Sequence, residues 1–343
     1  MRCSIVPPYL LLRIAESQEP RLAGAAAAAR RALLHDIPLR NLRGVAAERP
    51  EAPGPPGLHR TISTADHTET LPGRVVRAEG DGATGDNATD EAYDGLGHTY
   101  SFFSAAYSRA SIDNASLPLD GTVHYGDAYD NAFWDGARMV FGDGDGEVFN
   151  RFTLSLSVIG HELVHGMTQY TTNLVYQGQS GALNESISDV FGALVEQYAA
   201  GHTTATASWL IGEGLFTDLV QGSAIRSLKA PGTAYDDDVL GKDPQPDHMD
   251  AFITTTDDNG GVHLNSGIPN RAFYLTASAL GGFAWERAGQ IWYDAITAGT
   301  LPAASDFTLF AAATADAASA RFGHGSEEHR AVSRAWQSVG VDP

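Results

Sequence analysis

A histidine pair in the middle of the chain has the spacing of a metal site. His161 and His165 stand four residues apart in the segment His-Glu-Leu-Val-His. On a helix, positions i and i+4 share one face, so both imidazoles can reach the same ion. Glu162 is poorly placed to bind that ion with them, but its carboxylate can hold a water beside the metal. The pattern predicts a hydrolytic metal site, and the alternative is a helix with two exposed histidines.

A second segment supplies the further ligand that a catalytic zinc site needs. Glu185 lies 20 residues beyond His165, and Asp189 follows it at i+4. Glu185 can bind the metal while Asp189 accepts an N–H from one ligand histidine, and Asn184 can do the same for the other. An amphipathic helix with its acids toward solvent is the alternative. The apolar neighbours of both acids argue against it, because buried acids need partners.

A third segment, Asp258–Gly267, places a histidine after a glycine turn. Gly260 and Gly261 indicate a tight turn, and His263 follows it just before a helix that we expect to start near Ser266. Asp258 could orient this histidine or keep it protonated. A loop histidine with no role in chemistry is the alternative.

The elements that must position these residues change character along the chain. Short strands are predicted at 73–77 and 121–125, a loop at 80–97, and a helix at 99–109. After Leu154 the period becomes helical, with predicted helices at 156–171, 181–200, 266–279, 284–298, 306–322 and 326–339.

The three segments, in this order, resemble the thermolysin family of zinc metalloendopeptidases. The resemblance extends over residues 58–343 and includes further motifs at 131–134, 142–146, 176–177, 225–227, 291–295 and 339–341. It implies an α+β fold, a two-lobed zincin with a cleft between the lobes. Residues 58–167 would form a β-rich lobe that ends in the active-site helix, and residues 168–343 a mainly helical lobe.

The resemblance also implies a role for each matching residue. Zinc would be held by His161, His165 and Glu185, and Glu162 would activate a zinc-bound water and pass its proton to the leaving amine. Tyr176 and His263 would donate to the oxyanion, with Asp258 orienting His263. Asn131, Ala132 and Arg226 would hold the peptide. An apolar pocket of Phe149, Phe152, Val158 and Ile225 implies cleavage before large apolar residues.

The residues at the calcium-binding positions of the family differ in this chain. Glu196 and Glu213 keep two acids of the double calcium site that thermolysin carries, but Ser157, Ser208 and Leu210 replace three others. Because calcium needs several oxygen ligands, usually charged, we expect this site to be missing. Glu79 and Asp81 are a weak candidate pair elsewhere.

The first 57 residues have a different composition, with Pro7-Pro8, an alanine run and a Pro/Gly-rich end. They resemble the short propeptide of the protealysin-type subgroup. We expect residues 1–57 to be a propeptide and linker that inhibits the enzyme, with Pro7, Pro8 and Tyr9 near the cleft. A proline pair could hold a strand there in a pose unsuited to hydrolysis. Cys3 could act as a zinc-binding switch thiolate, although an incidental cysteine is the simpler hypothesis.

Composition and charge exclude some classes of binding partner. The chain has 343 residues, 22 Lys+Arg and 42 Asp+Glu, a formal charge of −20, and one cysteine. The charge argues against nucleic acid and anionic membrane surfaces, and the lone cysteine excludes an intrachain disulfide. We expect a monomeric, exported zymogen that acts on peptides or proteins.

Two of these expectations, secretion and enzymatic activity, have alternatives. The apolar run at 9–12 is too short for a signal-peptide core. Work inside the cell on one partner protein is therefore the alternative to secretion. A zincin-fold binding protein without turnover is the alternative to an enzyme.

Overall fold

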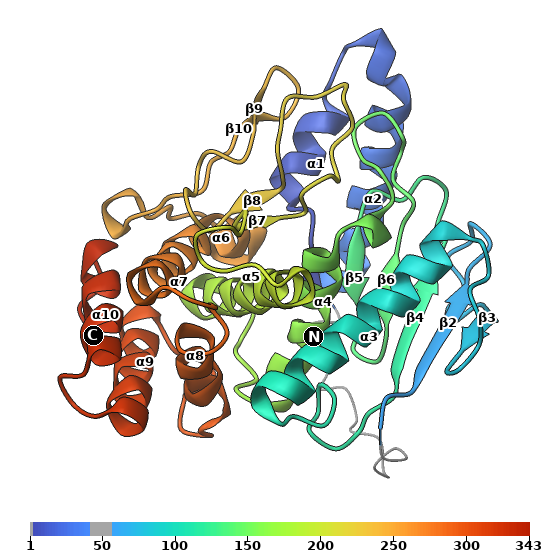
Figure 1. Cartoon of the computed structure of the whole chain (residues 1–343). Helices are drawn as coiled ribbons and strands as arrows, with labels where there is room; N and C mark the ends of the chain where they lie inside the picture. Colours follow the sequence, from blue (N-terminus) through green and yellow to red (C-terminus); the bar gives the residue numbers. More distant parts are fainter. Residues whose placement is uncertain (1–2, 42–56) are drawn as a thin grey trace.

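The structure is a computed structural model that describes residues 3–41 and 57–343, with the backbone alone for Cys3 and for residues 36–41. A six-stranded sheet and a set of helices form its two lobes (Figure 1). The sheet runs in the order β1-β5-β6-β4-β2-β3. Its strands are β1 (Cys3–Ser4), β2 (Arg60–Thr64), β3 (Arg74–Ala78), β4 (Leu119–Val123), β5 (Ala132–Trp134) and β6 (Met139–Phe141).

The neighbours β2, β4 and β6 are parallel, and β3, β5 and β1 add to them in antiparallel pairs. Two short hairpins lie outside the sheet. One pairs β7 (Leu210–Ile211) with β8 (Arg226–Ser227), and the other pairs β9 (Asp236–Asp237) with β10 (Gly241–Lys242).

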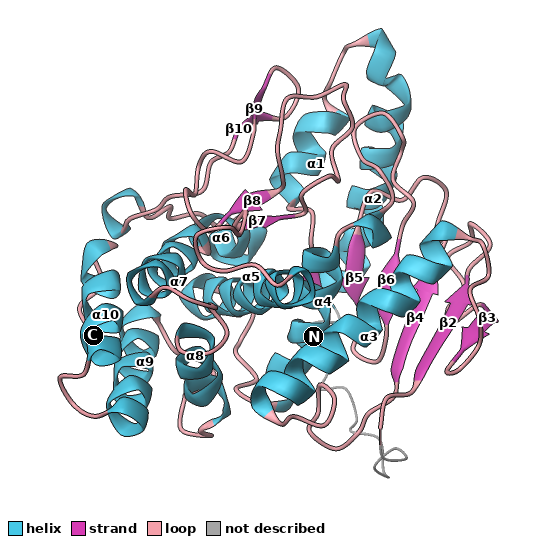
Figure 2. Ribbon diagram, viewed as in Figure 1, coloured by secondary structure: helices cyan, strands magenta, loops and turns pink. Residues whose placement is uncertain are grey.

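Helices make up the second lobe and cover the sheet (Figure 2). Helix α3 (Asn87–Tyr107) packs on β2 and β4, and α4 (Leu156–Tyr170) packs on β5 and β6. Helix α5 (Gly178–Ala200) lies between α4 and the C-terminal helices. These are α6 (Asp258–Asn265), α7 (Gly267–Leu280), α8 (Ala288–Thr297), α9 (Phe307–Phe322) and α10 (Glu327–Ser338). The 3-10 turns are η1 (Pro20–Leu22), η2 (Phe152–Leu154) and η3 (Met249–Ala251).

Two glycines bring α4 and α5 into backbone contact. A Cβ on Gly160 would stand 3.1 Å from the Cα of Gly192, and a Cβ on Gly192 would stand 2.4 Å from the carbonyl oxygen of Ser157. Only glycine fits so close an approach without displacing backbone. The two helices that carry the predicted metal ligands therefore pack closely where these glycines meet.

The two-lobed α+β prediction is confirmed, and the helices predicted after Leu154 all exist with shifted ends. The loop predicted at 80–97 is wrong in its second half, because α3 begins at Asn87, capped by the Asp86 side chain. The stretch is rich in glycine, aspartate and asparagine, which favours a loop, but Gly95 lies inside α3. A Cβ there would meet Ile159 of α4 at 2.4 Å, so this glycine serves helix packing and does not break the helix.

The N-terminal segment lies against the catalytic body. Strand β1 extends the sheet beside β5, and α1 (Pro8–Ala15) packs on α2 (Ala23–Asn41). The proline pair does not form the strand as predicted. Pro7 is extended and caps α1, and Pro8 is its first residue, a position where the missing N–H costs nothing. No described helix is long and apolar enough to cross a bilayer.

Candidate active site

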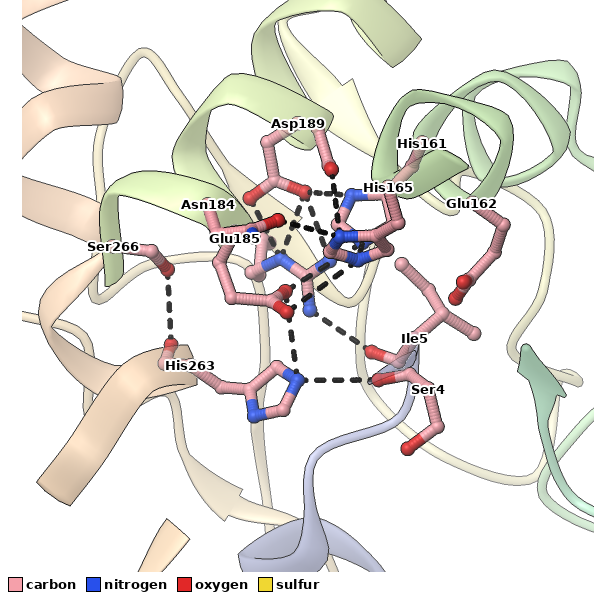
Figure 3. A network of polar contacts seen from close by, with 12 residues as sticks. Ser4, Ile5, His161, Glu162, His165, Asn184, Glu185, Asp189, His263 and Ser266 are labelled. Carbon is pink, nitrogen blue, oxygen red and sulfur yellow. Dashed lines mark hydrogen bonds and ion pairs between the residues drawn. The ribbon is translucent and has the colours of Figure 1, made fainter. Parts of the chain in front are cut away.

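Helices α4 and α5 bring His161, His165 and Glu185 together in the fully buried centre of the protein. The two Nε2 atoms are 3.0 Å apart. His161 Nε2 lies 3.5 Å from Glu185 Oε2, and His165 Nε2 lies 3.5 Å from Glu185 Oε1. Figure 3 shows the three side chains converging on one point from the two helices.

The hydrogen bonds on the far side of each ring fix which nitrogen carries the proton. His161 Nδ1 donates to Asp189 Oδ1 at 2.8 Å, and His165 Nδ1 donates to Asn184 Oδ1 at 2.8 Å. Both Nε2 lone pairs therefore point at each other, an arrangement that is repulsive unless a cation lies between them.

The charges of the cluster agree with a cation site. Burial lowers the pKa of His165 to about 3, so its imidazole is neutral at physiological pH. Burial alone would raise the pKa of Glu185, but the neighbouring histidines, His263 first, outweigh it and lower that pKa to about 2. In the part of the chain that the structure describes, the buried Glu185 Oε2 has no hydrogen-bond partner. Two imidazoles and a carboxylate at these separations fit zinc.

Glu162 lies beside this cluster with one oxygen held and one unbound. Its Oε2 accepts from the backbone N–H of Trp134 at 3.1 Å, and its buried Oε1 has no hydrogen-bond partner among the described residues. Burial, then the charge of Glu185, raises its pKa well above the usual value for a carboxyl group. A carboxylate in this environment takes up a proton readily, which is what a general base requires.

His263, on α6 of the same helical lobe, faces Glu185, with its Nε2 3.5 Å from Glu185 Oε2. Asp258 holds it twice, with Oδ1 2.7 Å from His263 Nδ1 and Oδ2 accepting from His263 N at 2.8 Å. Burial works against the imidazolium, but the charges of Asp258 and Glu185 outweigh it and raise the pKa of His263. Tyr176 donates to Glu185 and has its hydroxyl 3.3 Å from His263 Nε2. Both groups can therefore donate toward the metal cluster.

A buried carboxylate joins the metal cluster to an arginine. Asp189 accepts from Arg226 Nε at 2.9 Å and Nη2 at 2.8 Å, in addition to His161. Asn270 donates to the other Asp189 oxygen at 2.8 Å. Burial alone would raise the pKa of Asp189, but Arg226 and His161 outweigh it and hold that pKa well below its usual range. Asp189 thereby fixes the guanidinium through Nε and Nη2, and Nη1 has a different partner, the carbonyl oxygen of Ile5.

The N-terminal segment occupies this cleft, with strand β1 running into a bend at Ile5 and Val6. His263 Nε2 lies 3.1 Å from the carbonyl oxygen of Ser4 (Figure 3). Arg226 Nη1 donates to the carbonyl oxygen of Ile5 at 3.0 Å. On the other side, Ile5 N–H donates to the Ala132 carbonyl at 3.1 Å. Val6 N–H donates to Asn131 Oδ1 at 2.9 Å. Ile5 and Val6 are completely buried.

The structure thus brings together the predicted ligands, Glu162, His263, Tyr176, Asp258, Asn131, Ala132, Arg226, Asn184 and Asp189. The four predicted pocket residues, Phe149, Phe152, Val158 and Ile225, are all buried in the core that includes Ile5. Three contributors were not predicted. The Trp134 N–H is a backbone donor, and Asn270 lies in no motif. Ser188, whose hydroxyl lies 3.1 Å from His165 Nδ1, is part of the second segment but had no predicted role.

The remnants of the family calcium site form other contacts. Ser157 N–H donates to Glu196, and the Ser157 hydroxyl accepts from the N–H of Gly212. Over residues 4–35 and 57–343, Glu196 and Glu213 belong to no group of three close metal-ligating side chains. Glu79 is paired with Arg60, and Asp81 accepts from Ala78 N–H.

Comparison with known proteins agrees with the site. The family model of the thermolysin metallopeptidase catalytic domain matches residues 53–169, and that of the α-helical domain matches residues 172–341. An extracellular metalloprotease of Pectobacterium carotovorum is 51% identical over 99% of this chain and 96% of its own. Thermolysin of Alicyclobacillus acidocaldarius is 40% identical over 83% of this chain and 50% of its own. The solved precursor of protealysin from Serratia proteamaculans superimposes with a TM-score of 0.90 at 50% identity, covering 99% of both chains.

Proposed function

The chain belongs to the thermolysin family of metallopeptidases, and we propose that it is made as a zymogen whose own N-terminal segment fills the active site. The observation that carries the proposal is the course of residues 4–6 through the cleft. Their backbone is held on both sides by groups that would otherwise bind a peptide substrate, and the side chains of Ile5 and Val6 are buried.

The chemistry requires a metal held by His161, His165 and Glu185. Zinc bound there would supply Lewis acidity, which would polarise a peptide carbonyl and acidify a nearby water. Glu162 takes up the proton of the attacking water at its unbound Oε1 and delivers it to the leaving nitrogen. Its raised pKa suits both steps.

Charge that develops on the substrate carbonyl is stabilised by donors from the second lobe. His263 donates from Nε2 because Asp258 holds its Nδ1–H, and the Tyr176 hydroxyl lies beside it. The loss of such a donor typically costs roughly 100- to 1,000-fold in rate. Arg226 keeps the following residue of the substrate in register through its carbonyl, as it does for Ile5.

The bound segment also supports a specificity. In the register of these contacts the Ser4–Ile5 peptide bond faces His263, so Ile5 occupies the position after the cleaved bond. A buried aliphatic side chain there favours substrates with a large apolar residue at that position. The buried residues Phe149, Phe152, Val158 and Ile225 would form the pocket wall.

We propose release outside the cell, following relatives that are named extracellular, and action on peptides or proteins as a monomer. Residues 42–56, where the propeptide would end, lie outside the described residues. The side chain of Cys3 is also outside the description, so its role as a switch ligand stays a hypothesis. Unchanged latency of a Cys3→Ser variant would refute that role.

Removal of the N-terminal segment tests the proposal. Full-length protein and protein that begins at Leu58 should both bind zinc, and only the shorter form should cleave a casein-type substrate at full rate. Equal activity of the two forms would refute the zymogen. Absence of activity in both, with zinc bound, would refute the peptidase.

A further inference from the structure

A second cluster of metal-ligating side chains lies outside the active site, at one edge of the sheet. His67, His124 and Asp143 offer ligand atoms that are all within 4.8 Å of one another. His124 Nδ1 is 2.9 Å from Asp143 Oδ2, and His67 Nδ1 is 3.4 Å from the same oxygen. None of the three takes part in the chemistry proposed above.

The topology of the sheet explains why residues so far apart in sequence meet here. Strands β2, β4 and β6 are adjacent and parallel, so their carboxyl ends lie at the same edge. His67 comes three residues after β2, His124 directly after β4, and Asp143 two residues after β6. The His67 N–H also donates to the His124 carbonyl at 2.9 Å, which fixes the two loops against each other.

The separations suit a single small ion. With metal–ligand bonds of about 2.0–2.1 Å, tetrahedral ligands stand roughly 3.3 Å apart. The separations of 2.9 Å and 3.4 Å from Asp143 Oδ2 lie on either side of that value. The His67 and His124 rings lie with centroids 5.3 Å apart, so both imidazoles border the same space.

Asp86 completes the arrangement in the way that metal-binding histidines usually require. Its Oδ1 lies 3.2 Å from His124 Nε2, the ring nitrogen that faces away from Asp143. A carboxylate on the far nitrogen of a histidine orients the ring and makes it a better ligand. Asp86 is also the N-cap of α3, so its carboxylate is fixed in place.

We propose that His67, His124 and Asp143 form a second metal site, distinct from the catalytic one, for a zinc-like divalent transition metal. Two imidazoles and one carboxylate favour zinc, copper or nickel over calcium and magnesium, which prefer oxygen ligands. The His67 side chain is 64% exposed, so water completes the coordination and the ion exchanges with solvent. A bound ion would tie together the loops that follow three parallel strands.

Native mass spectrometry of the full-length chain with zinc alone as the probe tests the site, because it reports the intact mass and the zinc count together. Wild type should hold two zinc ions, and His67→Ala should hold one. His98→Ala is the matched control, since His98 is another exposed histidine, on α3, in neither metal cluster of the described residues. It should hold two ions.

Asp86→Asn provides a second variant that preserves the helix cap, because asparagine caps as well as aspartate. It should lower the zinc affinity of the proposed site tenfold or more, while zinc at the catalytic site stays bound. A single zinc in wild type would overturn the proposal and leave His124 as an ion-pair partner of two aspartates. A second zinc that persists in His67→Ala would also overturn it. Neither outcome bears on peptidase activity.

Discussion

Replacement of Ile5 by alanine should open the active site of the full-length protein. The Ile5 side chain is completely buried, and its backbone makes two of the hydrogen bonds that hold the segment in the cleft. Alanine keeps those backbone bonds and removes only the buried aliphatic surface. The substitution therefore measures what this one side chain contributes to closure.

The expected size of the effect follows from the complete burial of the Ile5 side chain. Truncation of a buried isoleucine to alanine costs about 2–4 kcal/mol from lost apolar transfer and the cavity that remains. Since about 1.4 kcal/mol is a factor of ten, the ratio of open to closed molecules should rise roughly 30- to 700-fold. The rise in activity stops when the open form predominates, and the processed enzyme gives that upper limit.

The assay is the initial rate of hydrolysis of an internally quenched peptide by full-length protein, with mass spectrometry to confirm that the chain is still intact. Leu12→Ala is the matched control, because Leu12 lies on α1 in the same segment but is 50% exposed. Its rate should equal that of wild type. If Ile5→Ala with zinc bound is as latent as wild type, burial of Ile5 does not hold the site closed.

Three further predictions concern stability and metals. Burial and the neighbouring Asp145 raise the pKa of Asp130 well above its unfolded value of about 3.9, so the unfolded chain releases this proton first and stability falls as pH rises from about 4. Asp130→Asn should therefore raise the melting temperature at pH 7, with a smaller gain at pH 5, and a gain independent of pH would contradict the cause. Asp189→Asn should weaken zinc binding about 10- to 100-fold. It should also lower the melting temperature, because it leaves the buried Arg226 charge poorly paired. Asn184→Ala should weaken zinc binding by a similar factor but lower the melting temperature less. In zinc-buffered solution a calcium-selective chelator should leave the melting temperature unchanged, and a fall would reveal a calcium site that the carboxylates of the described residues do not suggest.

The active site could be predicted from the sequence where local spacing carries it. His161 and His165 are four residues apart, as are Glu185 and Asp189. Each pair therefore lies on one face of its helix, independently of the tertiary structure. Their meeting depends on Gly160 and Gly192, which no periodicity identifies as a crossing point.

Other features depend on tertiary structure alone. Asn270 reaches Asp189 from α7 without a motif, and Trp134 contributes only a backbone N–H, which every residue except proline has. The cluster of His67, His124 and Asp143 escaped prediction because it exists only when three parallel strands align. Pro7, Pro8 and Tyr9 were expected near the cleft, but the structure places Ser4, Ile5 and Val6 there, and the pairing of β1 with β5 could be learned only from the structure.

The central claim is that Glu162 is the base of a peptidase whose metal is held by its neighbours, and one measurement tests it most directly. Protein that begins at Leu58 is prepared as wild type and as Glu162→Gln, and zinc content and kcat/KM on an internally quenched peptide are determined on the same samples. The account predicts that zinc remains at His161, His165 and Glu185 in both, while kcat/KM falls by about 100- to 10,000-fold in the variant. Unchanged cleavage with the same zinc content would contradict it.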